Sequence, residues 1–400
     1  MSNLPKDFSD LPRDLAEEVL SKVVPVTSVR RVRSTCKKWN TLTRRRSFKK
    51  KHLGGQAKLA AKKREFMVVV MMDFRVYLMR VNLHTKVEFC IERQGTLIFP
   101  DASDQILVRQ VFHCDGLLLC ILKDNPRLVV FNPYCGGQPR WIEATYSSYH
   151  RWQNFCYALG YNSSTKSHKI LSLFMSDDHE GPEVVEFKIY DLNSCDSSWR
   201  VLDVDPRQDW VIVSDSRGVS LKGNTYWFAQ EMYSETPSQG DFSFLICFDF
   251  TRETFGPRLP LPFVWFPEDT VTLSTVRDEQ LAVLFQREDS LQMEIWVTTK
   301  IAPNSVSWSS NFFLSVNTKV LTTVDDEAFM FTYMSSQFFI DEVKKVAVVF
   351  DRCKDSRMMR YTAYIIGQDG SFKEVDLGES LDQFRAPFVC PYVPSAMQLE

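Results

Sequence analysis

The chain has 400 residues, of which 44% are hydrophobic and 24% are charged, an ordinary balance for a soluble globular protein. Its longest apolar run, Phe66–Met72, spans seven residues, whereas a membrane-spanning helix needs roughly 20. The stretch Met1–Asp7 has no apolar segment of the signal-peptide kind. We therefore expect neither a membrane protein nor a secreted one, but an intracellular protein of the nucleus and/or the cytoplasm.

Charge is distributed unevenly along the chain. The formal net charge is −2, but residues 1–64 hold 18 lysines and arginines against 5 aspartates and glutamates, a balance of +13 that leaves −15 for the remainder. Basic runs at Arg44–Arg46, Lys49–Lys51 and Lys62–Arg64 suit nuclear import, nucleic acid, an acidic protein partner or the solvated face of short helices. Aromatic residues are not interleaved with these lysines, as they are in single-strand binders. We therefore interpret residues 49–64 as a solubilising linker that is helical in part.

The first predicted helix begins at Pro12, a residue that suits a first helical turn, and ends before the next proline. Leu15, Val19 and Val23 recur at i, i+4 and i+8, with Leu20 beside them. This spacing predicts one apolar stripe along the helix.

A second helix is predicted from Val29, Val32, Cys36 and Trp39, which fall at steps of three and four, with arginines and lysines on the opposite side. A third short helix is expected to contain Phe48. Helices this short bury little surface by themselves. Their apolar stripes therefore leave two alternatives, which are packing against a β domain of the same chain or docking on a partner.

From Phe66 onward the helical period gives way to short apolar runs separated by turn signals, which predicts strands. A unit recurs in which an apolar strand ends in Asn or Asp, a polar turn follows, and an aromatic residue begins the next strand. The clear instances are Asn82 with Phe89, Asn132 with Trp141, Asp191 with Trp199, and Asp249 with Phe255. Degenerate instances are Thr299 with Trp308, and Gly367 with Phe372.

The period of this unit predicts the architecture of the β region. The four Asn or Asp positions are 50, 59 and 58 residues apart, which is the period of a kelch-like propeller blade. Each aromatic residue is expected to pack between neighbouring blades, while each Asn or Asp starts its turn by bonding its own backbone. The expected fold is therefore a small all-α module of three short helices followed by a large all-β domain, a propeller of five to six irregular blades. A pair of two-sheet sandwiches is the alternative.

The sequence shows no constellation of catalytic or metal-binding residues. Six histidines are scattered without metal-ligand spacing, and we interpret His113, which lies in an apolar run, as a core residue. Gly218–Gly223 is not a nucleophile elbow, and phosphate-loop and dinucleotide fingerprints are absent. The ten cysteines include no Cys-x-x-Cys pair and are expected to be reduced core residues. We expect a non-catalytic protein without a cofactor or metal.

Leu11-Pro12, the string Arg33-Ser-Thr-Cys-Lys-Lys-Trp39 and the downstream Phe48 and His52 occur together within residues 8–53. In combination they resemble an F-box, especially the plant type. In that family the element docks on a Skp-type adapter, which joins it to a cullin–RING ubiquitin ligase. One departure is the pair Val23-Val24, where the family usually has a single apolar residue before proline. An extra residue there would rotate one helix against the other.

Position by position, the resemblance assigns the adapter-docking surface to nine residues. They are Leu11, Pro12, Leu15, Val19, Leu20, Val29, Val32, Cys36 and Trp39.

Longer strings carry a second resemblance. Phe112-His-Cys-Asp-Gly-Leu-Leu-Leu-Cys120, Gly218-Val-Ser-Leu-Lys-Gly-Asn-Thr-Tyr-Trp227 and Phe255-Gly-Pro-Arg-Leu-Pro-Leu-Pro262 are similar to the F-box-associated interaction domain, type 1. The similarity covers nearly all of residues 66–395. It implies a plant F-box protein whose C-terminal domain binds a degradation target.

Together the resemblances imply an F-box at residues 1–53, a basic linker at 54–64 and an F-box-associated, propeller-like β domain at 65–400. They imply a substrate-recognition subunit of an SCF-type (Skp–cullin–F-box) ubiquitin ligase, with the β domain holding an unidentified protein target and no membrane partner. The alternative is a basic nuclear or nucleic-acid-binding scaffold that acts without the ligase. The sequence does not identify the substrate-binding residues. Candidate loops, chosen because they are polar and bear aromatic residues, are Tyr146–Asn154, Ser176–Glu183 and Glu231–Asp241.

Overall fold

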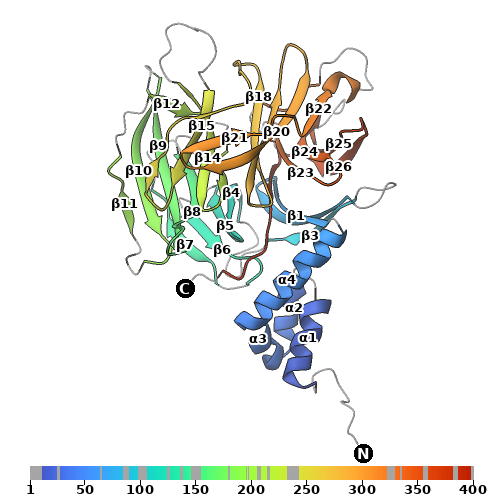
Figure 1. The fold of residues 1–400 in the computed structure, drawn as a ribbon. Helices are drawn as coiled ribbons and strands as arrows, with labels where there is room; N and C mark the ends of the chain where they lie inside the picture. Colours follow the sequence, from blue (N-terminus) through green and yellow to red (C-terminus); the bar gives the residue numbers. More distant parts are fainter. Residues whose placement is uncertain are drawn as a thin grey trace, which may run out of the picture.

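The computed structural model describes residues 11–24, 28–63, 65–83, 90–97, 106–123, 127–135, 138–145, 155–178, 181–194, 196, 198–204, 209–213, 217–231, 243–321, 329–333, 336–354, 359–381 and 386–397. Within these residues a helical module lies at the N-terminal end and a ring of β-sheets makes up the rest (Figure 1). Among the described helices, none is both long and apolar enough to cross a membrane.

The described part of the helical module contains four helices where three were predicted. They are α1 (Arg13–Val23), α2 (Val29–Thr35), α3 (Lys37–Thr43) and α4 (Arg46–Lys63). The predicted second helix is divided at Cys36, whose backbone is extended at φ −155° and ψ 159°. The Cys36 thiol accepts the backbone N–H of Trp39 at 3.5 Å. It thereby caps α3 in the way that Ser or Asp caps other helices.

Helix α4 crosses the predicted boundary between the F-box-like segment and the linker. It runs for 18 residues and passes through Gly54-Gly55 without a break. Residues 54–63, expected to be a linker that is helical in part, therefore continue the last helix. Glycine is a poor helix former, so packing must hold this helix together. Its first half supplies that packing through the buried side chains of Phe48 and His52, and β1 (Glu65–Met72) follows it (Figure 1).

The described strands form six antiparallel sheets, which we name blades 1 to 6. Blade 1 contains β27 (Phe388–Pro391), β1, β2 (Arg75–Asn82) and β3 (Cys90–Thr96). Blade 2 contains β4 (Val108–Cys114), β5 (Leu117–Leu122), β6 (Arg127–Phe131) and β7 (Arg140–Glu143). Blade 3 contains β8 (Phe155–Tyr161), β9 (His168–Asp178), β10 (Gly181–Asp191) and β11 (Trp199–Val201).

Blades 4 and 5 have additional short strands, whereas blade 6 again has four. Blade 4 contains β12 (Trp210–Ile212), β13 (Val219–Leu221), β14 (Asn224–Glu231), β15 (Ser243–Asp249), β16 (Thr254–Phe255) and β17 (Leu259–Pro260). Blade 5 contains β18 (Thr270–Val276), β19 (Gln280–Gln286), β20 (Gln292–Ala302), β21 (Ser305–Trp308) and β22 (Leu314–Asn317), followed by the 3₁₀ turn Thr318–Leu321. Blade 6 contains β23 (Gln337–Asp341), β24 (Val346–Lys354), β25 (Met359–Gly367) and β26 (Phe372–Glu379).

The sheets form a propeller and not the pair of sandwiches that was the alternative. Each neighbouring pair of blades shares one hydrophobic core, so the series closes on itself. The closure is made by the C-terminal strand, because β27 pairs with residues 68–71 of β1 in blade 1. The predicted five to six blades are thus six in the described residues, and a closed ring leaves few sheet edges exposed.

The recurring Asn or Asp marks the same place in successive blades, the connection between the third and fourth strands. The side-chain oxygens of Asn132, Asp191 and Asp249 each accept the backbone N–H two residues further on, at 2.9, 2.8 and 2.8 Å. This is the turn that the sequence pattern predicted.

The aromatic residues of the repeat contact the preceding blade. The indole N–H of Trp199 in blade 3 donates to the Glu143 carbonyl of blade 2 at 2.8 Å. Trp308 in blade 5 does the same to the Pro260 carbonyl of blade 4, also at 2.8 Å. The predicted role of these residues between blades is confirmed at both positions.

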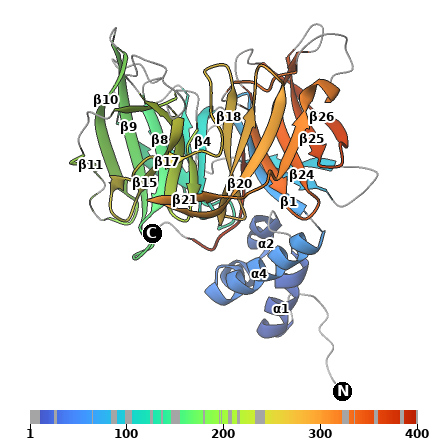
Figure 2. The ribbon, with the colours of Figure 1, turned by 45° about the horizontal axis from the view of Figure 1, so that its top comes forward.

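The propeller has two distinct faces. In an antiparallel blade the hairpins between strands 1 and 2 and between strands 3 and 4 lie at one end, and the remaining connections lie at the other. The helical module packs at the first end, against the turn that follows β6. We call this end the helix face, and Figure 2 shows the helices below it.

Candidate functional site

The helical module has an internal core to which two of the predicted docking residues belong. Leu20 of α1 and Val29 of α2 are buried together with Ala16, Leu42 and Phe48. The structure therefore places Leu20 and Val29 inside the module and not on its surface. The physical reason is helix geometry, because Leu20 lies one turn beyond Ala16 on the face of α1 that meets the other helices.

The predicted stripe of α1 lies on the outside of the module. Leu15 is 53% exposed and Val23 is 71% exposed, while Val19 between them is partly buried. Pro12, just before the helix, is exposed as well. An exposed apolar stripe on a helix is unfavourable in water unless a partner covers it. Val23 is an exposed member of the stripe that the position-by-position assignment did not include.

The remaining predicted residues line the edge of the same module. Leu11, Val32 and Trp39 are partly buried and pack against the internal core, and Cys36 is also partly buried. The Lys38 ammonium donates to the Leu11 carbonyl at 2.9 Å, which ties the chain before α1 to α3.

The departure at Val23-Val24 is accommodated within the module. Val24 is buried in the core, while Val23 points outward. The Val24 N–H donates to the Leu20 carbonyl at 3.2 Å, and the Val24 carbonyl accepts from the His52 ring at 2.7 Å. The two valines thus have different roles, one in the core and one in the outer stripe.

The helical module carries many exposed positive charges. Exposed cations occupy all four helices and the turn before α4: Arg13, Lys22, Arg31, Lys37, Lys38, Arg44, Arg45, Arg46, Lys50, Lys51, Lys58, Lys62 and Lys63. Glu18 of α1 is paired with Lys22 at 2.7 Å and with Lys51 of α4 at 2.9 Å. Hydrogen bonds from these ammonium groups lower the pKa of Glu18 to about 2, so it stays ionised and links α1 to α4.

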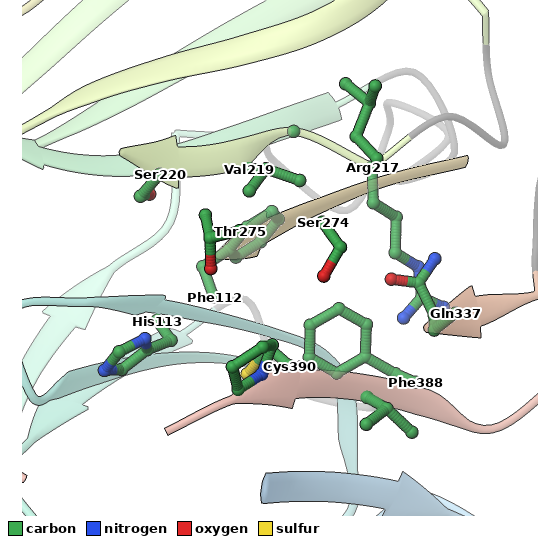
Figure 3. A pocket seen from close by; sticks show the side chains of 14 residues that line it. Phe112, His113, Arg217, Val219, Ser220, Ser274, Thr275, Gln337, Phe388 and Cys390 are labelled. Atoms are coloured by element: carbon green, nitrogen blue, oxygen red, sulfur yellow. The ribbon is translucent and has the colours of Figure 1, made fainter. Parts of the chain in front are cut away.

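The axis of the propeller contains a small cavity. Its volume is about 40 Å³, which is enough for a few water molecules. Figure 3 shows Arg217 reaching toward Gln337, with Phe388 and Ser274 beside them. The Arg217 guanidinium lies 4.6 Å from the centre of the Phe388 ring. Among the described residues, no group of three His, Cys, Asp or Glu side chains is arranged to hold a metal ion.

His113 lies beside this cavity and has a structural role, as the sequence indicated. Its Nε2 accepts the Gly116 N–H at 3.1 Å, which requires a neutral ring. Burial lowers the pKa of His113 to about 4, although nearby Asp115 opposes the shift. The nine cysteines in the described residues are all free thiols.

The loops proposed from the sequence for target binding fall mostly outside the described residues. All of Tyr146–Asn154 lies outside them, as do most of Glu231–Asp241 and the centre of Ser176–Glu183.

Residues 8–51 match the family model of the F-box domain, and residues 67–399 match the model of the F-box associated beta propeller domain. In Arabidopsis thaliana, the putative F-box protein At3g24580 is 54% identical over 97% of this chain and 98% of its own length. The F-box/kelch-repeat protein At3g16740 of the same plant is 53% identical over 98% of this chain and 99% of its own length.

Similarity to solved structures is weak. A luciferin-regenerating enzyme aligns with a TM-score of 0.35 and 8% identity, over 67% of this chain and 76% of that one. Nothing about function follows from a likeness at this level.

Proposed function

The chain belongs to the F-box proteins that carry an F-box-associated β-propeller domain, and we propose that it is the substrate-recognition subunit of an SCF-type ubiquitin ligase. In this proposal the helical module docks on a Skp-type adapter, which connects it to a cullin–RING ligase. The propeller binds a protein target. The family is one of adapters and receptors, and the proposed role requires no chemistry from the chain itself.

One observation carries the docking half of the proposal. Leu15 and Val23 form an apolar stripe on the outside of α1 that the chain's own propeller leaves uncovered. The inner face of the same helix, with Ala16 and Leu20, is already used for the core. The sequence left open whether the apolar residues pack internally or dock on a partner. The two faces of α1 support both alternatives: the inner face packs within the chain, and the outer face is available to a partner.

The proposed mechanism is proximity. A target held on the propeller and a charged ubiquitin-conjugating enzyme held by the cullin–RING part form one assembly. The reaction between them then depends on an effective concentration and not on a chance encounter. The helices lie at one face of the propeller (Figure 2), which leaves the opposite face free for the target.

A second candidate function rests on the exposed cations of the helical module. Direct binding of nucleic acid by this surface would be dominated by phosphate contacts and would weaken steeply as salt is added. It would not depend on Leu11 or Trp39. A filter-binding series over salt concentration, with wild type and Trp39→Ala side by side, separates this function from adapter docking.

The test of the first proposal is co-purification with a Skp-type adapter. Wild type is compared with a Leu11→Ala/Pro12→Ala double variant, since these residues stand at the start of the proposed surface. The matched control is Leu381→Ala, which removes an 85% exposed leucine from the propeller. We expect adapter recovery to fall in the double variant and to be unchanged in the control. Equal recovery from all three proteins would refute the docking proposal.

The target itself can be sought by affinity capture and mass spectrometry with the proteasome inhibited. The double variant serves as the comparison, because it retains the propeller. A true target should be captured by both proteins but should lose ubiquitin in the presence of the variant. A protein whose ubiquitination does not differ between them is not a target of this ligase.

A further inference from the structure

The propeller contributes two side chains to the core of the helical module. The turn Asn132–Cys135 follows β6 on the helix face, and its Tyr134 and Cys135 are buried among Ala16, Leu20, Val24, Val29, Leu42 and Phe48 of the helices. Tyr134 is only 2% exposed. The core of the module is therefore built from two parts of the chain that are distant in sequence.

A chain of hydrogen bonds passes from this turn through the module. His52 of α4 lies between the Tyr134 hydroxyl, 2.8 Å from Nδ1, and the Val24 carbonyl, 2.7 Å from Nε2. A carbonyl only accepts, so Nε2 carries the proton and donates. In a neutral ring Nδ1 then accepts, and the Tyr134 hydroxyl donates to it. Burial lowers the pKa of His52, which agrees with a neutral ring. The series Tyr134–His52–Val24 thus joins the propeller to α4 and to the end of α1.

Arg33 makes the second polar connection. This arginine of α2 is buried, and its guanidinium donates to the carbonyls of Tyr134, at 3.2 Å, and of Cys135. Its Nε also donates to Thr43 Oγ1 at 3.4 Å. A buried cation is costly unless its N–H groups are bonded. Two of the acceptors that satisfy Arg33 belong to the propeller, so the helices alone cannot replace them.

The turn is itself held rigidly by the propeller. Asn132 Oδ1 accepts the N–H groups of Tyr134 at 2.9 Å and of Cys135 at 3.1 Å. Its amide donates to the carbonyls of Ser395 at 3.1 Å and Met397 at 2.8 Å, in the segment that follows the closing strand β27. The Ser395 hydroxyl in turn donates to the Asp115 carbonyl at 2.5 Å, on the innermost hairpin of blade 2.

From these contacts we infer that the propeller completes the F-box of this chain, with Tyr134 and Cys135 as core residues of the F-box and Arg33 and His52 as the residues that hold them. The F-box is then not an independent module at the end of a tether. Its folding and its orientation depend on the turn Asn132–Cys135. A fixed orientation of the helices would fix the adapter relative to the face that binds the target, and this consequence rests on the proposed function. The dependence of the helices on the turn Asn132–Cys135 does not rest on the proposed function.

The experiment is hydrogen–deuterium exchange, read by mass spectrometry, on the full chain without any partner. Tyr134→Ala is compared with wild type and with Phe285→Ala. Phe285 is a buried aromatic residue in the core between blades 4 and 5. This core lies on the opposite side of the propeller from blade 2, whose turn Asn132–Cys135 contacts the helices. In Tyr134→Ala we expect exchange in α1–α4 to accelerate by at least about tenfold, with β18–β20 unchanged. In Phe285→Ala we expect exchange in β18–β20 to accelerate and exchange in α1–α4 to be unchanged.

Two milder variants cover the case in which Tyr134→Ala fails to fold. Tyr134→Phe keeps the ring and loses only the hydroxyl that faces His52. Arg33→Lys keeps the charge and loses the planar fork that reaches both carbonyls. Each should accelerate exchange in the helices by a smaller factor than Tyr134→Ala. The inference is overturned if the helices keep wild-type protection in all three variants, or if Phe285→Ala opens the helices as much as Tyr134→Ala does.

The outcome is distinguishable from failure of the proposed function. Wild type and Tyr134→Ala are also titrated with a purified Skp-type adapter. If the adapter binds neither protein while the helices of Tyr134→Ala open, the helices do depend on the turn Asn132–Cys135 and the adapter proposal is wrong. If the adapter binds both proteins equally and exchange in α1–α4 is the same in both, the adapter proposal holds. The inferred dependence of the helices on the turn Asn132–Cys135 is then refuted.

Discussion

Replacing Leu15 by alanine tests whether the outer stripe of α1 is a docking surface. Leu15 is 53% exposed in the free chain, while Ala16 and Leu20 on the inner face carry the packing within the module. The substitution therefore removes contact area that a partner would use. We expect the free energy of unfolding to change by less than about 0.5 kcal/mol, as for surface positions in general.

The expected loss of binding follows from the exposed fraction. Burying a whole leucine side chain is worth about 1.5–3 kcal/mol, and roughly half of Leu15 is left for a partner to cover. Leu15→Ala should cost about 1 kcal/mol of adapter binding, which is about a fivefold increase in Kd. Val23→Ala should cost no more than this. The two losses should add, because the positions lie about 12 Å apart along the helix.

The assay is isothermal titration calorimetry of the full chain with a purified Skp-type adapter. Thermal unfolding of each variant shows whether the fold is intact, and Leu381→Ala on the propeller is the matched control. We expect weaker binding from Leu15→Ala, weaker binding still from the Leu15→Ala/Val23→Ala double variant, and wild-type binding from the control. If the double variant binds within about twofold of wild type, the stripe is not a docking surface and the reasoning from its exposure is wrong.

Three further predictions concern stability. Gly54→Ala should stabilise the chain by about 1 kcal/mol in urea unfolding, because it lies inside α4 and an added Cβ would meet nothing within 4 Å. Gly223→Ala should destabilise it by about 1–3 kcal/mol, since φ is +86° and the Cβ would lie 2.7 Å from the Tyr161 ring. Lowering the pH from 7 toward 4 should reduce the free energy of unfolding of wild type by up to about 3 kcal/mol more than that of His113→Gln. The reason is that the imidazole binds a proton near its ordinary pKa of 6.5 in the unfolded chain, whereas folded His113 has a pKa of about 4.

These predictions have simple controls and contrary outcomes. The two glycine variants control for each other, because the same substitution should have opposite signs at a helical site and at a site with positive φ. Matching signs would contradict the argument. For His113 the comparison with His113→Gln cancels the other titrating groups, and parallel pH profiles for the two proteins would show that this ring does not contribute to acid unfolding.

Local chemistry made much of the β domain predictable. An Asn or Asp that bonds its own backbone starts a turn wherever it occurs, so Asn132, Asp191 and Asp249 identified corresponding hairpins from the sequence alone. The aromatic residue that follows is partly buried, and the indole N–H groups of Trp199 and Trp308 contact the preceding blade. Because the unit repeats, its period also indicated the number of blades. The closing strand β27 carries no such signal, since its pairing with β1 joins opposite ends of the domain.

The helical module shows where local patterns stop being informative. The spacing of Leu15, Val19 and Val23 predicted a stripe, but Ala16, Leu20 and Val24 form an equally regular stripe rotated by one residue. Helical periodicity cannot say which of two adjacent stripes faces the core, because both repeat at the same interval. The packing of α1 against the other helices and Tyr134 made that choice. For the same reason Leu20 and Val29 lie in the core of the module.

The sequence by itself determined the kinds of elements, their repetition and the family, because these depend on residues close together in the chain or on strings that recur among relatives. The tertiary structure alone decided how the two parts meet. His52 and Tyr134 are 82 residues apart, and nothing in the local pattern around either residue indicates the other. A buried histidine needs partners for both ring nitrogens, and a buried arginine needs acceptors for its charge. Which residues meet those needs depends on the surfaces that three-dimensional packing brings together.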